Sequence, residues 1–119
     1  MTAKKTSSAV AGLGVDLAEV RRVRRLAANP KFLARVFTPV ELAYAGRGRN
    51  RFERLAARFA VKEAVIKALD DTSIPLKDIE VENTAGGSPR VTVKGRSCSL
   101  LVSITHTAAH AMAAVIALR

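Results

Sequence analysis

The chain has 119 residues and a mass of 12.7 kDa, and its 49% hydrophobic and 25% charged residues predict one globular domain over 1–119. Twenty Lys and Arg residues against ten Asp and Glu residues give a net charge of +10, which favours an anionic partner: a nucleic acid, a membrane surface, a phosphorylated ligand or an acidic protein. One cysteine and two histidines exclude an intrachain disulfide framework and a Cys/His zinc module, and indicate a cytoplasmic protein. No apolar run reaches the roughly 18 residues of a membrane span, so we expect no membrane segment and no signal peptide.

The N-terminal part of the chain is expected to begin with one strand. Residues 1–8 lack apolar periodicity, and we expect them to be disordered. Residues 11–20 place Leu13, Val15 and Leu17 on one side of an extended strand. Because small or apolar residues also occupy most of the other side, we interpret this segment as a mostly buried strand.

Two helix starts consist of a capping residue followed by proline. Asn29 precedes Pro30, so two short helices or one bent helix are expected after the strand. Thr38 precedes Pro39, and Glu41 at the third helical position completes a capping box. The longest helical pattern, RFERLAARFAVKEAVIKAL, covers 51–69.

The C-terminal half has the composition of strands. DIEVEN and PRVTV, separated by TAGGS, predict a hairpin. SLLVSI and AMAAVIAL predict a second strand pair around THTAAH, although the alanines of the last run also suit a helix. The expected fold class is therefore α+β, with a small antiparallel sheet packed against one long helix.

The net charge belongs to the helical half of the chain. Residues 21–67 hold 13 Lys and Arg residues against three acidic residues, and the remaining residues balance. Like charges in RRVRR repel one another unless a partner neutralises them. This distribution favours a docking face for an acidic partner, and a solvated arginine-rich surface is the plainer alternative.

Two carboxylates lie in apolar surroundings on different predicted elements. On a wheel of about 100° per residue, Glu63 falls within an apolar stripe made of Phe52, Ala56, Phe59 and Ile66. Burying an unpaired carboxylate is unfavourable, so the plainer alternative is an ion pair with Lys67, one turn further on. Asp16 repeats the pattern inside the apolar run LGVDL. Two such carboxylates suggest a shared cation.

The ligand types indicate which cation this is. Carboxylate oxygens without a nearby cysteine favour a hard ion, and magnesium is the default. Because magnesium completes its shell with water and phosphate oxygens, we expect a substrate that carries phosphate. Arg58, Lys62 and Lys67 are candidates for holding its other phosphates. His106 follows a predicted strand, where functional side chains are common, but a lone histidine is more often structural.

Three segments, GLGVDLAEVRRV, FTPVELAYAGRGRNRFERLAARFAVKEAVIKAL and VSITHT, together resemble the holo-acyl-carrier-protein synthase family of short phosphopantetheinyl transferases. The resemblance runs from Gly12 to Leu118 and implies the phosphopantetheinyl transferase fold. It also implies a magnesium-dependent transfer of the phosphopantetheine arm of coenzyme A to a serine of apo acyl carrier protein, with release of adenosine bisphosphate. Such proteins are typically homotrimers with active sites between subunits. Whether the carrier serves fatty-acid or polyketide synthesis stays open.

The resemblance also implies roles for individual residues. Asp16 and Glu63 match the metal-binding carboxylates of the family, and with Lys67, which matches a lysine near the pyrophosphate, they form the expected catalytic group. The positions that match contacts to coenzyme A are Arg58, Lys67, His106 and Thr107. The positions that match the helix docking acidic carrier proteins are Arg21, Arg22 and Arg25.

The chain departs from the family pattern at two places. The glycine-rich stretch that usually follows KAL is replaced by DDTSIPLKDIE, and the lysine of the family's G-K-P is replaced by Ser88. A catalytically inactive relative is therefore one alternative. The other is a small basic nucleic-acid-binding protein, which explains the charge but leaves Asp16 and Glu63 unexplained and lacks aromatic stacking platforms, since only 4% of residues are aromatic.

Overall fold

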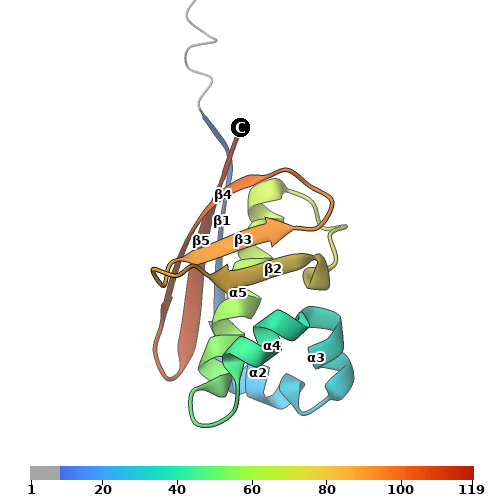
Figure 1. Ribbon diagram of the computed structural model, residues 1–119, viewed down its shortest axis with the longest axis vertical. Helices are drawn as coiled ribbons and strands as arrows, with labels where there is room; N and C mark the ends of the chain where they lie inside the picture. The colour runs from blue at the N-terminus through green and yellow to red at the C-terminus, as the bar shows by residue number, and fades with distance from the viewer. Residues whose placement is uncertain (1–8) are drawn as a thin grey trace, which may run out of the picture.

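The computed structural model describes residues 9–119, so the disorder expected for residues 1–8 lies outside the described residues. The chain alternates little between helix and strand: one strand leads into four helices, and four strands follow (Figure 1). No helix among residues 9–119 is long and apolar enough to cross a bilayer. The elements in order are β1 (Val10–Glu19), α2 (Val20–Ala27), α3 (Pro30–Val36), α4 (Pro39–Ala45), α5 (Arg51–Leu69), the 3-10 turn η1 (Leu76–Asp78), β2 (Ile79–Asn83), β3 (Pro89–Val93), β4 (Ser99–His106) and β5 (His110–Leu118).

The strands form two antiparallel sheets. β1, β5 and β4 make a three-stranded sheet in that order, and β2 pairs with β3 in a separate two-stranded sheet. Both predicted strand pairs are therefore confirmed, and the alanine-rich last run is a strand. In the larger sheet Asp16 lies opposite Ala113, and His106 lies opposite Ala111. The α+β prediction with one long helix against antiparallel strands is confirmed, with the strands divided between two sheets.

Local capping explains where α3 and α4 begin. The Asn29 side chain accepts a hydrogen bond from the Lys31 amide at 2.9 Å, and two short helices form, α2 and α3. Thr38 and Glu41 form the predicted capping box at the start of α4. α5 covers the predicted 19 residues. Figure 1 shows α2, α3 and α4 gathered at one end of the molecule, beside the first turns of α5.

β1 packs directly against the backbone of α5. A Cβ atom at Gly12 would lie 1.9 Å from the Ala68 carbonyl oxygen, and one at Gly14 would lie 2.0 Å from the Ala64 carbonyl oxygen. Only glycine permits this approach. Because alternate residues of a strand share one face, Asp16 lies on the same face as both glycines and is turned toward α5.

The prediction that the first strand is mostly buried is wrong for one of its faces. Leu13 and Leu17 are each 63% exposed, whereas Gly14 and Ala18 are buried. The reason is that α5 covers only one face of the three-stranded sheet. The uncovered face carries the exposed apolar residues Leu13, Val15, Leu17, Leu101 and Met112.

The apolar stripe assigned to α5 also needs correction. Within the predicted stripe Ala56 is fully buried, whereas Phe52, Phe59, Glu63 and Ile66 are only half-buried, at the margin of the packed surface. The buried side of α5 is made mainly of small residues, because β1 and β5 approach the helix closely while β2 and α4 pack on it from another direction. Glu63 is therefore at the edge of the core and is accessible to a ligand.

The loop after α5 closes without glycine. Asp70 itself adopts the left-handed conformation at φ 52°, which caps the helix in the way glycine usually does. Asp71 accepts hydrogen bonds from the Ser73 hydroxyl and amide and pairs with Arg96. These contacts, with Ser73 contributing most, lower the pKa of Asp71 to about 2.

Candidate active site

Asp16 and Lys67 meet across the contact between β1 and α5. Lys67 Nζ lies 3.1 Å from Asp16 Oδ1 and donates a second hydrogen bond to the Val15 carbonyl oxygen at 3.0 Å. The Asp16 side chain is 18% exposed, so it is accessible although it points toward the helix. The alternative of a Glu63–Lys67 pair along the helix is wrong, because the lysine reaches the strand instead. Two of the three residues of the expected catalytic group are thus in contact.

Glu63 lies one turn before Lys67 on α5, and residues four apart on a helix share one side, so we refer to Asp16, Glu63 and Lys67 as the carboxylate cluster. The half-buried side chain of Glu63 has no ion pair or hydrogen bond with any residue of 9–119. Residues 9–119 contain no group of three or more His, Cys, Asp or Glu side chains arranged to hold a metal ion. Two accessible carboxylates fit magnesium, which binds through one or two protein carboxylates and takes its other ligands from water and substrate phosphates.

Lys62 is not available to a phosphate, and that prediction is wrong. Its side chain is fully buried, with Nζ 2.7 Å from Glu41 Oε1. The ammonium also donates to the carbonyl oxygens of Leu76, at 3.0 Å, and Ile79. Burial lowers the pKa of Lys62, and the Glu41 carboxylate opposes that effect. All three ammonium protons have acceptors inside the protein, so the residue has a structural role.

Arg58 is buried at the other side of α5. It is 4% exposed, donates from Nη2 to Asn83 Oδ1 at 2.8 Å, and stacks its guanidinium 4.0 Å from the centre of the Tyr44 ring. Its Nε has no hydrogen-bond partner within 9–119. Burial lowers the pKa of Arg58, partly offset by Tyr44. A buried cation with an unused donor is suited to an anionic ligand.

A cavity of about 270 Å³ brings Arg58 and His106 together. Arg54 contributes a second guanidinium to its wall. His106 is held from outside the cavity, since its Nδ1 lies 3.1 Å from Glu53 Oε1. The remaining lining residues come from α4, α5, β4 and the β2–β3 hairpin: Tyr44, Ala57, Asn83, Gly87, Pro89 and Ile104. Two of the predicted coenzyme contacts therefore share one basic cavity.

The expected site is divided between two places on the chain. Lys67 and Arg58 are nine residues apart on α5, which is about two and a half turns, so their side chains leave the helix on opposite sides. Neither Asp16, Glu63 nor Lys67 lines the cavity of Arg58 and His106. One copy of the chain thus presents a carboxylate cluster on one side of α5 and a basic cavity on the other.

Thr107 lies outside both places, in the turn between β4 and β5. Its hydroxyl oxygen accepts hydrogen bonds from the amides of Ala109, at 3.2 Å, and His110, at 3.1 Å. This contact shapes the turn. The residue is exposed, and its predicted contact with coenzyme A stays a prediction.

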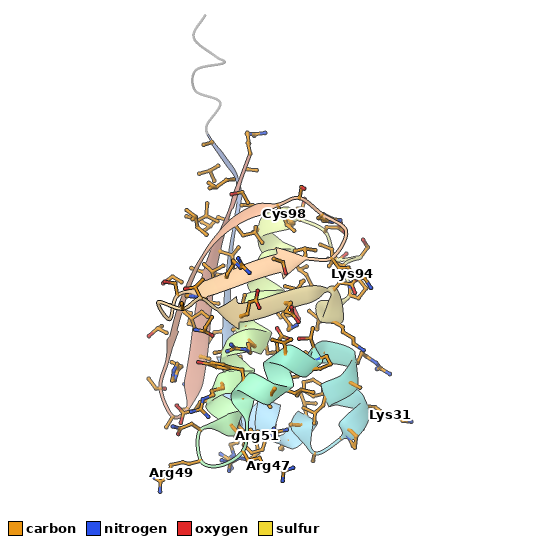
Figure 2. The ribbon with its side chains drawn as sticks, in the orientation of Figure 1. Lys31, Arg47, Arg49, Arg51, Lys94 and Cys98 are labelled. Atoms are coloured by element: carbon orange, nitrogen blue, oxygen red, sulfur yellow. The ribbon has the colours of Figure 1, made fainter. Side chains whose placement is uncertain are left out.

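The arginines predicted to bind a partner are exposed on α2. Val20 and Val23 turn into the core, whereas Arg21, Arg22 and Arg25 face solvent. Further arginines, from the loop before α5 and from the first residue of α5, lie at the same end of the molecule, where Figure 2 shows Arg47, Arg49 and Arg51. The Phe52 ring joins the two sets, because it lies beneath the guanidinium groups of both Arg24 and Arg51.

Three supporting residues were not predicted from the sequence. Tyr44 and Asn83 hold Arg58, and Glu53 holds His106. The sequence gives no signal for the role of Glu53, because asparagine three residues before a glutamate is typical of a helix start, whereas Asn50 makes no side-chain cap in the structure. The other two contacts join residues from separate elements without any shared pattern.

The chain is similar to known proteins over most of its length. A family model described as the 4'-phosphopantetheinyl transferase superfamily matches residues 12–116. A holo-[acyl-carrier-protein] synthase of Thermodesulfovibrio yellowstonii is 44% identical over 110 residues, which cover 90% of this chain and 97% of that protein.

Solved structures of similar proteins share the fold. The crystal structure of a holo-(acyl-carrier-protein) synthase from Bacillus anthracis in complex with CoA (3',5'-ADP) has a TM-score of 0.83 and 30% identity, covering 93% of this chain and 98% of that chain. A holo-[acyl-carrier-protein] synthase of Helicobacter pylori in complex with coenzyme A has a TM-score of 0.78 and 27% identity, covering 88% of this chain and 98% of that chain.

Proposed function

Because the chain belongs to the 4'-phosphopantetheinyl transferase superfamily, we propose that it transfers the phosphopantetheine arm of coenzyme A to a serine hydroxyl of apo acyl carrier protein and releases adenosine bisphosphate. It is an enzyme of the holo-acyl-carrier-protein synthase type. One observation carries the detailed proposal: residues 51 positions apart, Asp16 and Lys67, meet at 3.1 Å, with Glu63 one helical turn before Lys67. This cluster combines the carboxylates and the cation that phosphoryl transfer from a pyrophosphate requires.

Asp16 and Glu63 are the residues that would hold magnesium. When bound, the ion would neutralise negative charge on the pyrophosphate of coenzyme A. Lys67 contributes a second positive charge beside the leaving phosphate, since its ammonium is half exposed next to Asp16. Arg58 and Arg54 contribute positive charge to the wall of the basic cavity, which would attract the anionic coenzyme.

The transfer exchanges one phosphorus–oxygen bond for another. The serine oxygen of the carrier forms a bond to the phosphorus that bears pantetheine, and the bond from that phosphorus to the bridging oxygen of the pyrophosphate breaks. The leaving group keeps the electron pair as adenosine bisphosphate, and the serine proton passes to a base. Because this chemistry depends mainly on positioning and electrostatics, the protein needs to align the groups and stabilise charge.

Mass spectrometry of an apo acyl carrier protein, incubated with the protein, coenzyme A and magnesium, tests the transfer. We expect a gain of one phosphopantetheine mass that a chelator blocks. Asp16→Ala and Glu63→Gln should abolish the gain while the circular dichroism of the fold is unchanged. Glu82→Gln, which removes a surface carboxylate paired with Arg90, is the matched control and should keep the wild-type rate. Near-normal transfer by Asp16→Ala or Glu63→Gln would refute the metal role.

The proposed active enzyme is a homotrimer in which each site uses two copies of the chain. Two features support this: the uncovered apolar face of the three-stranded sheet, and the placement of the carboxylate cluster and the basic cavity on opposite sides of α5. Co-refolding Asp16→Ala with Arg58→Ala, each inactive alone, should restore transfer if one copy supplies the carboxylates and its neighbour the cavity. Absence of any recovery in a mixed oligomer confirmed by native mass spectrometry would refute the shared site.

The proposed docking face for the acidic carrier protein is the exposed side of α2. Replacing Arg22 and Arg25 by glutamate should raise KM for the carrier much more than KM for coenzyme A, because reversed charges repel the partner at the encounter. Lys77→Glu with Lys94→Glu changes the net charge equally near the β2–β3 sheet, and Figure 2 shows Lys94 well away from the α2 end. Equal effects of the two double variants would argue against docking on α2.

A further inference from the structure

The carboxylate of Glu53 is the feature of this molecule that the proposed chemistry leaves unused. Glu53 lies in the first turn of α5 at the same helical position that Glu41 occupies in α4. Glu41 closes a capping box and pairs with Lys62, but Glu53 makes no cap. Its side chain leaves the helix and meets His106 at the end of β4, 53 residues away in sequence.

The direction of the hydrogen bond follows from the chemistry of the two groups. An ionised carboxylate only accepts hydrogen bonds, so His106 Nδ1, at 3.1 Å from Glu53 Oε1, carries the proton and donates it. This holds for the neutral ring and for the protonated ring. In both states Nε2 is the ring nitrogen that remains for another partner, and His106 lines the cavity that contains Arg54 and Arg58.

The basic side chains of the cavity differ in what holds them in place. Arg54 donates to the Ala45 carbonyl oxygen, and Arg58 is fixed by Asn83 and Tyr44. His106 is nearly half exposed and is the last residue of β4, so packing alone does not fix the orientation of its ring. Glu53, whose side chain is more buried than that of His106, is the group that orients it.

We propose that Glu53 is a positioning residue for coenzyme A: its carboxylate holds the His106 imidazole with Nδ1 protonated and directs Nε2 to the ligand in the cavity. This inference rests on the proposed function, since it takes coenzyme A as the occupant. Glu53 itself does not line the cavity and acts through His106.

Steady-state kinetics and the nitrogen-15 spectrum of the His106 ring test the role together. Glu53→Ala should raise KM for coenzyme A roughly fivefold, the size expected for a partly exposed charge-assisted hydrogen bond. The value of kcat and KM for the carrier protein should stay within twofold. Glu53→Gln keeps an acceptor oxygen and should restore both KM and the Nδ1-protonated ring signature that Glu53→Ala loses. Glu82→Ala removes another ion-paired glutamate and should change neither readout.

A double variant separates positioning from a general structural effect. In the His106→Ala background, removing Glu53 should have no further effect on KM for coenzyme A. Additive losses, or an unchanged ring spectrum in Glu53→Ala, would overturn the positioning role. A wild-type protein that neither binds coenzyme A nor transfers its arm would instead overturn the proposed function, and the ring spectrum would still report whether Glu53 fixes His106.

Discussion

Replacing Lys62 by methionine tests whether this lysine supports the fold or the reaction. Lys62 directly precedes Glu63, and its sequence context suggested a phosphate ligand, whereas the structure buries it completely against Glu41. Methionine preserves most of the side-chain length but removes the charge. The variant leaves the Glu41 carboxylate in the core, where it still accepts hydrogen bonds from the amides of Thr38, at 2.9 Å, and Val81, at 2.8 Å.

The expected loss of stability is large for a single substitution. Removing one partner of a buried ion pair costs about 3–5 kcal/mol, because the remaining charge is left without compensation. A chain of this length has a free energy of unfolding of roughly 6–18 kcal/mol. Adding Glu41→Gln to Lys62→Met removes the stranded charge, and we expect the double variant to be only about 1–3 kcal/mol less stable than wild type, owing to the carbonyl oxygens of Leu76 and Ile79 that lose their donor.

Urea unfolding followed by circular dichroism at fixed protein concentration measures these differences. Lys67→Met is the matched control on the same helix: its half-exposed ammonium should change stability by less than about 1 kcal/mol, while transfer is lost. Lys62→Met should lose transfer only in proportion to the unfolded fraction. A fully folded Lys62→Met protein without transfer activity would refute the structural assignment, and so would a double variant less stable than Lys62→Met.

Two further predictions concern the packing of β1 and the loop after α5. Gly14→Ala should destabilise the protein by about 1–3 kcal/mol or more in thermal unfolding, because the added Cβ would lie 2.0 Å from the Ala64 carbonyl oxygen. As a control, the Cβ added in Gly86→Ala has no neighbour closer than 4.0 Å, so the stability of this variant should stay within about 0.5 kcal/mol of wild type. For Asp71 the folded-state pKa is about 2, below the ordinary value of 3.8, so its contribution to stability is present above pH 3.8 and is lost as the pH falls toward 2. Unfolding temperatures of Asp71→Asn should therefore decline less steeply than those of wild type between pH 4 and 2, and parallel curves would contradict this account.

The starts of α3 and α4 were predictable because their causes are local. Asn29 and Thr38 cap helices through atoms only two or three residues away, so the pattern of cap, proline and Glu41 contains the whole interaction. The length of α5 and the β2–β3 hairpin follow from periodicity and turn residues in the same way. Asp16 and Lys67 are far apart in the sequence, so no local pattern predicts their ion pair. Two observations pointed to this region: the carboxylates of Asp16 and Glu63 in apolar surroundings, and the family resemblance.

Burial depended on contacts that the sequence does not contain. Lys62 and Lys67 look alike in the run AVKEAVIKA, yet α4 and β2 enclose the first and leave the second half exposed. The faces of β1 were ambiguous because apolar residues occupy both of them. What decides the outcome is the close approach of α5 to Gly12 and Gly14, a tertiary contact that leaves the leucines on the outer face.

The composition of the core supports the proposed assembly. Ten of the 23 buried hydrophobic residues within 9–119 are alanine, so the interface between α5 and the sheet buries little side-chain area for each residue. Several of the larger apolar side chains of the same sheet, including Leu13, Leu17 and Leu101, lie on the uncovered face. Burying them would contribute about 25 cal/mol for each Å² of apolar surface removed from water. An alanine-lined core with leucines outside suits a subunit that buries its remaining apolar surface against neighbouring copies. Replacing Leu17 by lysine should therefore dissociate the oligomer in sedimentation equilibrium, while the separated subunits stay folded.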